Sequence, residues 1–148
     1  MSLKAQLTQA MKEAMKAKDT VRLTTVRMAL AAVKNKEIEA GKELDDAAVT
    51  ALLSTLAKQR REAAEAYRDG DREELAVKEE AELVVIQSFL PEPLTEAELD
   101  ELIEAAVAES GAGSMKDMGK VMKLVSAQTT GRADGRLVSE RVKARLSA

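Results

Sequence analysis

Apolar residues recur every three or four positions through most of the chain, which is the spacing of one face of an α-helix. In the first segment, Leu3, Leu7, Met11 and Met15 form such a stripe, and comparable stripes follow in six further segments. Runs of β-branched and aromatic residues, which favour strands, are scarce. The pattern therefore predicts an all-α protein with helices at about 3–17, 19–41, 45–70, 71–90, 95–110, 114–131 and 134–146.

Polar residues in front of these stripes indicate where several of the helices begin. Thr95 and Glu98 have the spacing of a capping box, and Asp71 with Glu74 resembles the same pair. Ser114 follows a glycine-containing turn and is the expected cap of the sixth helix.

The segment Pro91-Glu92-Pro93 interrupts the helical pattern. Proline lacks a backbone N–H group and restricts the residue before it, so a helix does not continue through such a segment. We therefore expect two domains. Residues 1–92 form a larger four-helix bundle, and residues 93–148 form a small three-helix bundle.

The composition supports the same fold and excludes much chemistry. Apolar residues make up 45% of the chain but aromatic residues only 1%, so the core must consist of Ala, Leu, Val, Ile and Met. The chain has no Cys and no His. Disulfides, zinc sites with thiolate or imidazole ligands, and Ser-His or Cys-His nucleophiles are therefore excluded. We expect no catalytic residue, no metal and no cofactor.

No run approaches the roughly 18 apolar residues of a membrane span. The chain starts with an amphipathic helix instead of the apolar segment of a signal peptide. We expect a cytoplasmic protein that has no contact with a membrane.

Charge is strongly segregated along the chain, although the formal net charge is only −3. Residues 1–36 contain eight basic and two acidic residues, which gives +6. Residues 94–114 contain six acidic and no basic residues, hence −6, and residues 115–148 contain eight basic and three acidic residues, hence +5. The acidic fifth helix therefore competes with any external polyanion for the basic C-terminal segment.

The sixth helix has the clearest candidate for a binding surface. At about 100° per residue, Lys116, Lys120 and Lys123 fall on the face opposite to the apolar positions such as Val121 and Val125. Clustered cations of this kind suit a partner rich in phosphate, because binding to a polyanion releases counterions. The alternative is a solvated face that keeps the domain soluble, since charged outer faces are common.

The turn after the sixth helix adds Arg132 and Arg136 to the candidate RNA-binding residues. Gly131, Asp134 and Gly135 are expected to shape this turn. Gly131 can end the sixth helix in a left-handed conformation, and Asp134 can cap the seventh helix.

Several motifs resemble those of the GatB/YqeY family, and the resemblance covers essentially the whole chain. The C-terminal motifs are Met118-Gly119-Lys120-Val121-Met122-Lys123, Gly131-Arg132-Ala133-Asp134-Gly135 and Val138-Ser139-x-x-Val142-Lys143. The N-terminal ones are Met11-Lys12-x-Ala14-Met15-Lys16-x-Lys18-Asp19, Arg22-Leu23, Arg27 through Lys34 to Glu37, Glu79-x-x-Glu82 and Leu90-Pro91.

The resemblance implies two helical bundles and a similarity to the tail domain of the B subunit of the tRNA-dependent glutamine amidotransferase. In that carbon–nitrogen ligase, which uses glutamine as amido donor, the tail is implicated in contacting the body of the tRNA. The kinase and transamidation chemistry lies in other parts of the complex. The amidotransferase tail often has proline where this chain has Gly135, which places the chain nearer the free-standing branch of the family.

Our leading hypothesis is a non-catalytic module that binds tRNA or another structured RNA, with amidotransferase or synthetase proteins as further partners. One alternative is a protein-interaction adaptor whose small bundle docks onto an enzyme or synthetase. Sequence-specific DNA binding through the last two helices is a weaker alternative, because the chain is acidic overall. The sequence leaves the oligomeric state open.

Overall fold

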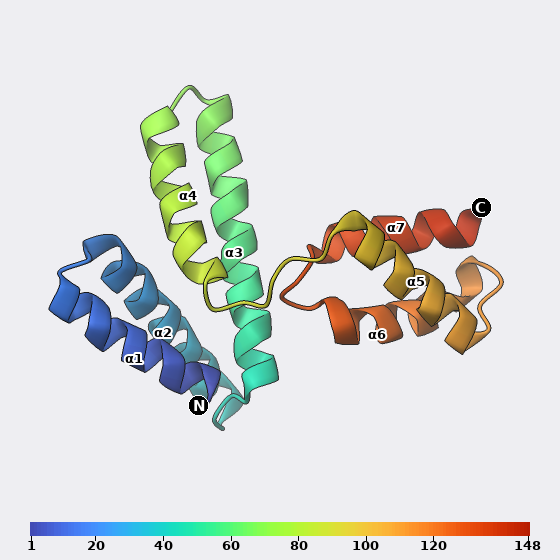
Figure 1. Ribbon diagram of the computed structural model, residues 1–148, viewed down its shortest axis with the longest axis horizontal. Coiled ribbons are helices and arrows are strands. Elements are labelled where there is room, and N and C mark those ends of the chain that lie inside the picture. Colours follow the sequence, from blue (N-terminus) through green and yellow to red (C-terminus); the bar gives the residue numbers. More distant parts are fainter. The chain divides into compact units, whose positions relative to one another are not determined.

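The computed structural model describes residues 1–148 and contains helices as its only regular elements. The predicted all-α fold is confirmed (Figure 1). No helix combines the length and the apolar character that crossing a membrane requires. The elements are α1 Leu3–Ala17, α2 Thr20–Ala40, α3 Asp46–Asp69, α4 Glu73–Gln87, α5 Glu96–Ser110, the 3-10 helix η1 Met115–Asp117, α6 Met118–Thr129 and α7 Gly135–Ser147.

The chain forms two compact units that meet at the prolines. Unit 1 comprises Met1–Pro91 and unit 2 comprises Glu92–Ala148, so the division falls one residue before the boundary expected from the sequence. Each unit buries its own cluster of apolar side chains.

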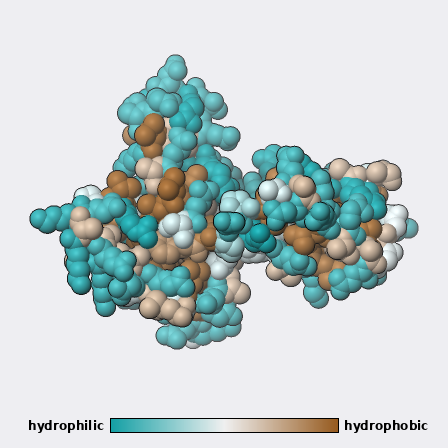
Figure 2. Space-filling view, viewed as in Figure 1, coloured by the Kyte–Doolittle hydropathy of each residue, from teal (hydrophilic) through white to brown (hydrophobic).

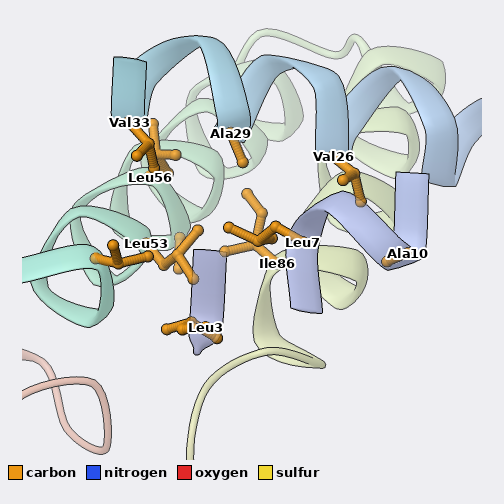
Figure 3. Close-up of a cluster of buried hydrophobic side chains, with 11 residues drawn as sticks. Leu3, Leu7, Ala10, Val26, Ala29, Val33, Leu53, Leu56 and Ile86 are labelled. Carbon is orange, nitrogen blue, oxygen red and sulfur yellow. The ribbon is translucent and has the colours of Figure 1, made fainter. Parts of the chain in front are cut away.

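Unit 1 consists of two helical hairpins, α1 with α2 and α3 with α4, and α2 also packs on α3 and α4. Side chains from all four helices point into one shared interior (Figure 3). Alanines are buried at many of the helix contacts and let the backbones approach closely. The core residues of this cluster are Leu3, Leu7, Ala10, Val26, Ala29, Val33, Val49, Leu53, Leu56, Ala57 and Ile86.

Unit 2 is a three-helix bundle in which α6 packs on both α5 and α7, and α5 packs on α7. Within each helix the buried residues lie three or four positions apart, so one face of each helix is used for packing and the other faces solvent. The core residues are Leu99, Ile103, Ala106, Val107, Val121, Val125, Val138, Val142 and Leu146.

Most of the visible surface of both units is hydrophilic, with smaller hydrophobic areas (Figure 2). The most exposed large apolar side chains within the helices are Ile38 on α2 and Val77 and Val84 on α4.

Polar side chains cap the starts of α5 and α2. The Thr95 hydroxyl accepts a hydrogen bond from the Glu98 N–H at 3.1 Å, and the Glu98 carboxylate accepts one from the Thr95 N–H at 3.3 Å. Asp19 caps α2 in the same way by accepting from the Arg22 N–H at 3.2 Å. The capping box predicted for the fifth helix is therefore confirmed.

The predicted capping pair of Asp71 and Glu74 is wrong. Asp71 adopts a left-handed conformation with φ 58°, and the cap position of α4 is held by Arg72, whose side chain makes no capping bond. The connection between α3 and α4 is very short. The N–H groups of Asp71 and Arg72 donate hydrogen bonds to carbonyls of the last turn of α3, at 3.2 and 2.7 Å. Asp71 therefore closes the end of α3 and does not cap α4.

The prediction that Ser114 caps the sixth α-helix is also wrong. Its hydroxyl accepts from the Lys116 N–H at 3.4 Å and starts η1, whereas α6 begins at Met118. Asp117 turns its carboxylate back to the Gly113 N–H at 3.0 Å. This local hydrogen bond tightens the turn, and Lys116 consequently lies on η1.

Candidate nucleic-acid interface

Three exposed lysines of η1 and α6 have no ion-pair partner, and we call them the lysine face. Lys116 on η1 and Lys120 and Lys123 on α6 are all exposed. No carboxylate oxygen lies within 4.0 Å of their ammonium groups. Because α6 turns Val121 and Val125 into the core, Lys120 and Lys123 face solvent on the opposite side.

Few acidic residues lie near these lysines, and the carboxylate of the adjacent Asp117 is bonded to the Gly113 N–H. Helix α6 contains no Asp or Glu. Gly119 is exposed and has open space around the position of a Cβ atom, and Ala127 is exposed one turn beyond Lys123. The lysine face therefore has few large side chains to obstruct the approach of an anionic backbone.

Two arginines of α7, Arg141 and Arg145, are arranged differently, because acidic residues of α5 neutralise them. Arg141 donates to both oxygens of Asp100 at 2.9 and 3.0 Å and lies 3.2 Å from a carboxylate oxygen of Glu96. Arg145 forms an ion pair with Glu104. Hydrogen bonding to Asp100 raises the pKa of Arg141. The acidic face of α5 thus binds Arg141 and Arg145 and leaves the lysine face unpaired.

Arg132 connects the turn to the segment that enters α5. Its Nε donates to the Glu92 carbonyl at 3.0 Å, and its own carbonyl accepts from the Leu94 N–H at 2.8 Å. A carboxylate oxygen of Glu98 lies 4.0 Å away. This guanidinium already has intramolecular partners, in contrast to the three lysines.

Arg136 lies in the first turn of α7 with 79% of its side chain exposed. The one ion-pair partner of its guanidinium is Glu140 on the same helix, at 3.6 Å. Exposed i,i+4 pairs of this kind contribute only tenths of a kcal/mol, so Arg136 remains available to an external anion.

The three loop-shaping candidates have distinct places in the structure. Gly131 has φ 82°, a left-handed conformation that favours glycine. Asp134 caps α7 by accepting from the Arg136 N–H at 3.0 Å. Gly135 is the first residue of α7 and a Cβ there would meet no neighbour within 4 Å. The first helical position accepts proline well, which agrees with the proline that amidotransferase tails often have there.

Lys143 is a further candidate that the sequence reasoning did not single out. It is exposed, has no ion-pair partner, and follows Arg141 by two positions on α7. Two positions along a helix correspond to a rotation of about 200°, which turns Lys143 away from the acidic side of α5. The signal in the sequence that could have identified it is its place in the motif Val138-Ser139-x-x-Val142-Lys143.

A shallow groove runs between α5 and α7. Ile103 and Leu137 contribute apolar surface, and the paired residues Asp100, Arg141 and Arg145 border it. Leu137 is 40% exposed. Because its charges are already paired, this groove is less suited to a polyanion than the lysine face.

Comparison with known proteins relates the chain to one family over nearly its full length. The sequence profile of the Yqey-like proteins matches residues 4–146. A protein of Lachancea thermotolerans named "Altered inheritance of mitochondria protein 41, mitochondrial" is 40% identical over 108 residues, which are 71% of this chain and 58% of the relative.

Proteins with the same name from other fungi are also similar to this chain. The one from Eremothecium gossypii is 41% identical over 87 residues, or 58% of this chain and 48% of the relative. The one from Pyrenophora tritici-repentis is 32% identical over 136 residues, or 90% of this chain and 75% of the relative. The chain spans about half the length of the first two relatives. Since the family match extends from residue 4 to residue 146, the chain belongs to the YqeY-like family, as its motifs indicated.

Proposed function

We propose that this protein is a non-catalytic module that binds tRNA or another structured RNA through the lysine face of unit 2. One observation carries the proposal. The carboxylates of α5 pair with arginines of α7, yet Lys116, Lys120 and Lys123 stay exposed and unpaired.

Contacts to phosphates are the expected mode of binding. Each lysine that neutralises a phosphate releases condensed counterions, which makes the affinity depend steeply on salt. Base stacking contributes little, because Tyr67 and Phe89 are the two aromatic residues of the chain and both belong to unit 1. We therefore expect recognition of RNA shape and backbone with little dependence on base sequence.

The connection to amidotransfer belongs to the same proposal. It is supported by the resemblance to the amidotransferase tail, and it assigns this protein an accessory role in a carbon–nitrogen ligation that uses glutamine as amido donor. A cytoplasmic location is likewise proposed. The fungal relatives are named as mitochondrial proteins.

Binding of purified full-length protein to bulk tRNA and to an unrelated folded RNA tests the proposal. The variant with Lys120→Glu and Lys123→Glu should lose affinity by on the order of tenfold for each lysine at 0.1 M salt, since each phosphate contact contributes a salt slope of about −0.9. The loss should be similar for both RNAs, because phosphate contacts do not read sequence.

A matched control reverses the charges of Lys58 and Arg61 on α3. These residues are also exposed, also lie three positions apart, and have no ion-pair partner. The control should retain nearly the native affinity. An equal loss of affinity in the control would show that the effect comes from the net charge of the protein. Unchanged affinity in a folded Lys120→Glu, Lys123→Glu variant would refute the assigned surface. Salt-insensitive binding to a protein, without binding to RNA, would favour the adaptor instead.

A further inference from the structure

Unit 1 contains a second group of basic residues, located on α1 and α2. Some of its cations have intramolecular partners. Lys4 lies 2.8 Å from Glu37, Lys36 lies 3.7 Å from Glu39, and the guanidinium of Arg22 lies 5.1 Å from the centre of the Phe89 ring.

The other cations of these two helices have no acidic partner. Lys12 and Lys16 on α1 and Arg27 and Lys34 on α2 are exposed, and none takes part in an ion pair. They are separated by four and by seven positions, so each pair lies along one side of its helix. We call these four residues the hairpin face.

The hairpin face points away from the core on both helices. Helix α1 buries Leu7 and Ala14, and helix α2 buries Val26, Ala29 and Val33. At about 100° per residue, the four cations fall on the outer sides of their helices.

The antiparallel packing of the two helices brings one cation of each helix to a similar height along the hairpin. The Lys4–Glu37 pair lies near one end, and the short connection at Lys18 and Asp19 closes the other. This antiparallel register places Lys12 about level with Arg27.

Few carboxylates are available to neutralise the hairpin face. Residues 1–36 include two acids, Glu13 and Asp19. Asp19 caps α2, and Glu13 accepts from the Gln9 amide at 3.2 Å. In the second hairpin, Arg60, Arg68 and Arg72 pair with glutamates, whereas Lys58, Arg61 and Lys78 are exposed and have no ion-pair partner.

We propose that the hairpin face is a second phosphate-contacting surface, which binds the same structured RNA as the lysine face. The inference rests on the proposed function, because both surfaces act on one polyanion. The two faces belong to separate units of one chain, so binding at one raises the effective concentration of RNA at the other. Their contributions to the salt dependence add, since each contact releases its own counterions.

Salt titrations of full-length variants with bulk tRNA test this inference. Three neutralising pairs are compared with the native chain: Arg27→Gln with Lys34→Gln in the hairpin face, Lys120→Gln with Lys123→Gln in the lysine face, and Lys58→Gln with Arg61→Gln as control. In each of the first two variants, the negative slope of log K against log salt should become shallower by about one unit for every contact removed. The control should leave the slope and the affinity unchanged, and far-UV circular dichroism verifies that each variant is folded.

The outcomes separate the two proposals. Native slope and affinity in the Arg27→Gln, Lys34→Gln variant would overturn the second surface, while loss in the Lys120→Gln, Lys123→Gln variant would still support the lysine face. The reverse result would overturn the lysine face and support the hairpin face. A native chain that binds no tRNA at low salt would overturn both.

Discussion

At the scale of single residues, the availability of each cation depends on its partners. Arg132, Arg141 and Lys123 all belong to the basic C-terminal segment, yet Arg132 bonds to the Glu92 carbonyl and Arg141 bonds to Asp100. Lys123 has no such partner. The sequence correctly indicated a basic segment, but the contacts of the fold distinguish the structural cations from the accessible ones.

A pH-dependent contribution to stability is expected at Glu37. Its carboxylate accepts from the Lys4 ammonium at 2.8 Å and from the Leu44 N–H at 2.9 Å, and these bonds lower its pKa. A carboxyl group whose pKa is lower in the folded state stabilises the fold above its unfolded pKa of about 4.3, and this stabilisation disappears as the pH falls through the folded value.

The Glu37→Gln variant should therefore be less stable than the native chain at pH 7, and the difference should shrink as the pH falls below about 4. Urea unfolding followed by circular dichroism at several pH values measures this. Glu39→Gln on the same helix is the control, because its pair with Lys36 is largely exposed and contributes little. A difference between native and Glu37→Gln chains that stays constant with pH would contradict the argument.

At the scale of helices, the start of a helix was predictable from a capping residue where the preceding connection is long enough to leave that residue extended. The Thr95–Glu98 box follows the proline segment, which leaves Thr95 in the extended conformation that a cap requires. Asp71 was predicted wrongly because the short α3–α4 connection uses its backbone to close α3. Ser114 was predicted wrongly because the Asp117 carboxylate returns to Gly113, and a 3-10 turn precedes α6. The spacing of residues in the sequence does not reveal these competing hydrogen bonds to backbone groups.

The capping box of α5 gives a prediction for stability. Thr95→Ala removes the oxygen that accepts from the Glu98 N–H and should cost about 1 kcal/mol. Thr95→Ser retains that oxygen and should cost much less. Thermal unfolding followed at 222 nm provides the comparison, and equal stability of the two variants would show that the cap contributes nothing.

At the scale of the whole molecule, the sequence shows that charge is segregated, but it does not show which cations the acidic segment neutralises. The acidic segment at 94–114 competes in principle with an external polyanion for every cation of the C-terminal segment. In the fold, α5 and α7 turn their charged sides toward each other, so Asp100 and Glu104 pair with Arg141 and Arg145. Which cations are neutralised depends on the packing of the bundle, and periodicity within one helix does not determine that packing.

The central claim is that the lysine face binds RNA. Lysine acetylation of the native chain with and without saturating tRNA tests this claim most directly. Labelling at low salt, read by mass spectrometry, reports every lysine in one experiment without any substitution. We predict that Lys116, Lys120 and Lys123 are acetylated several-fold more slowly in the complex, whereas Lys58 and Lys78 keep their rates. Unchanged rates at the three lysines while tRNA is bound, or equal slowing at every lysine, would contradict the claim.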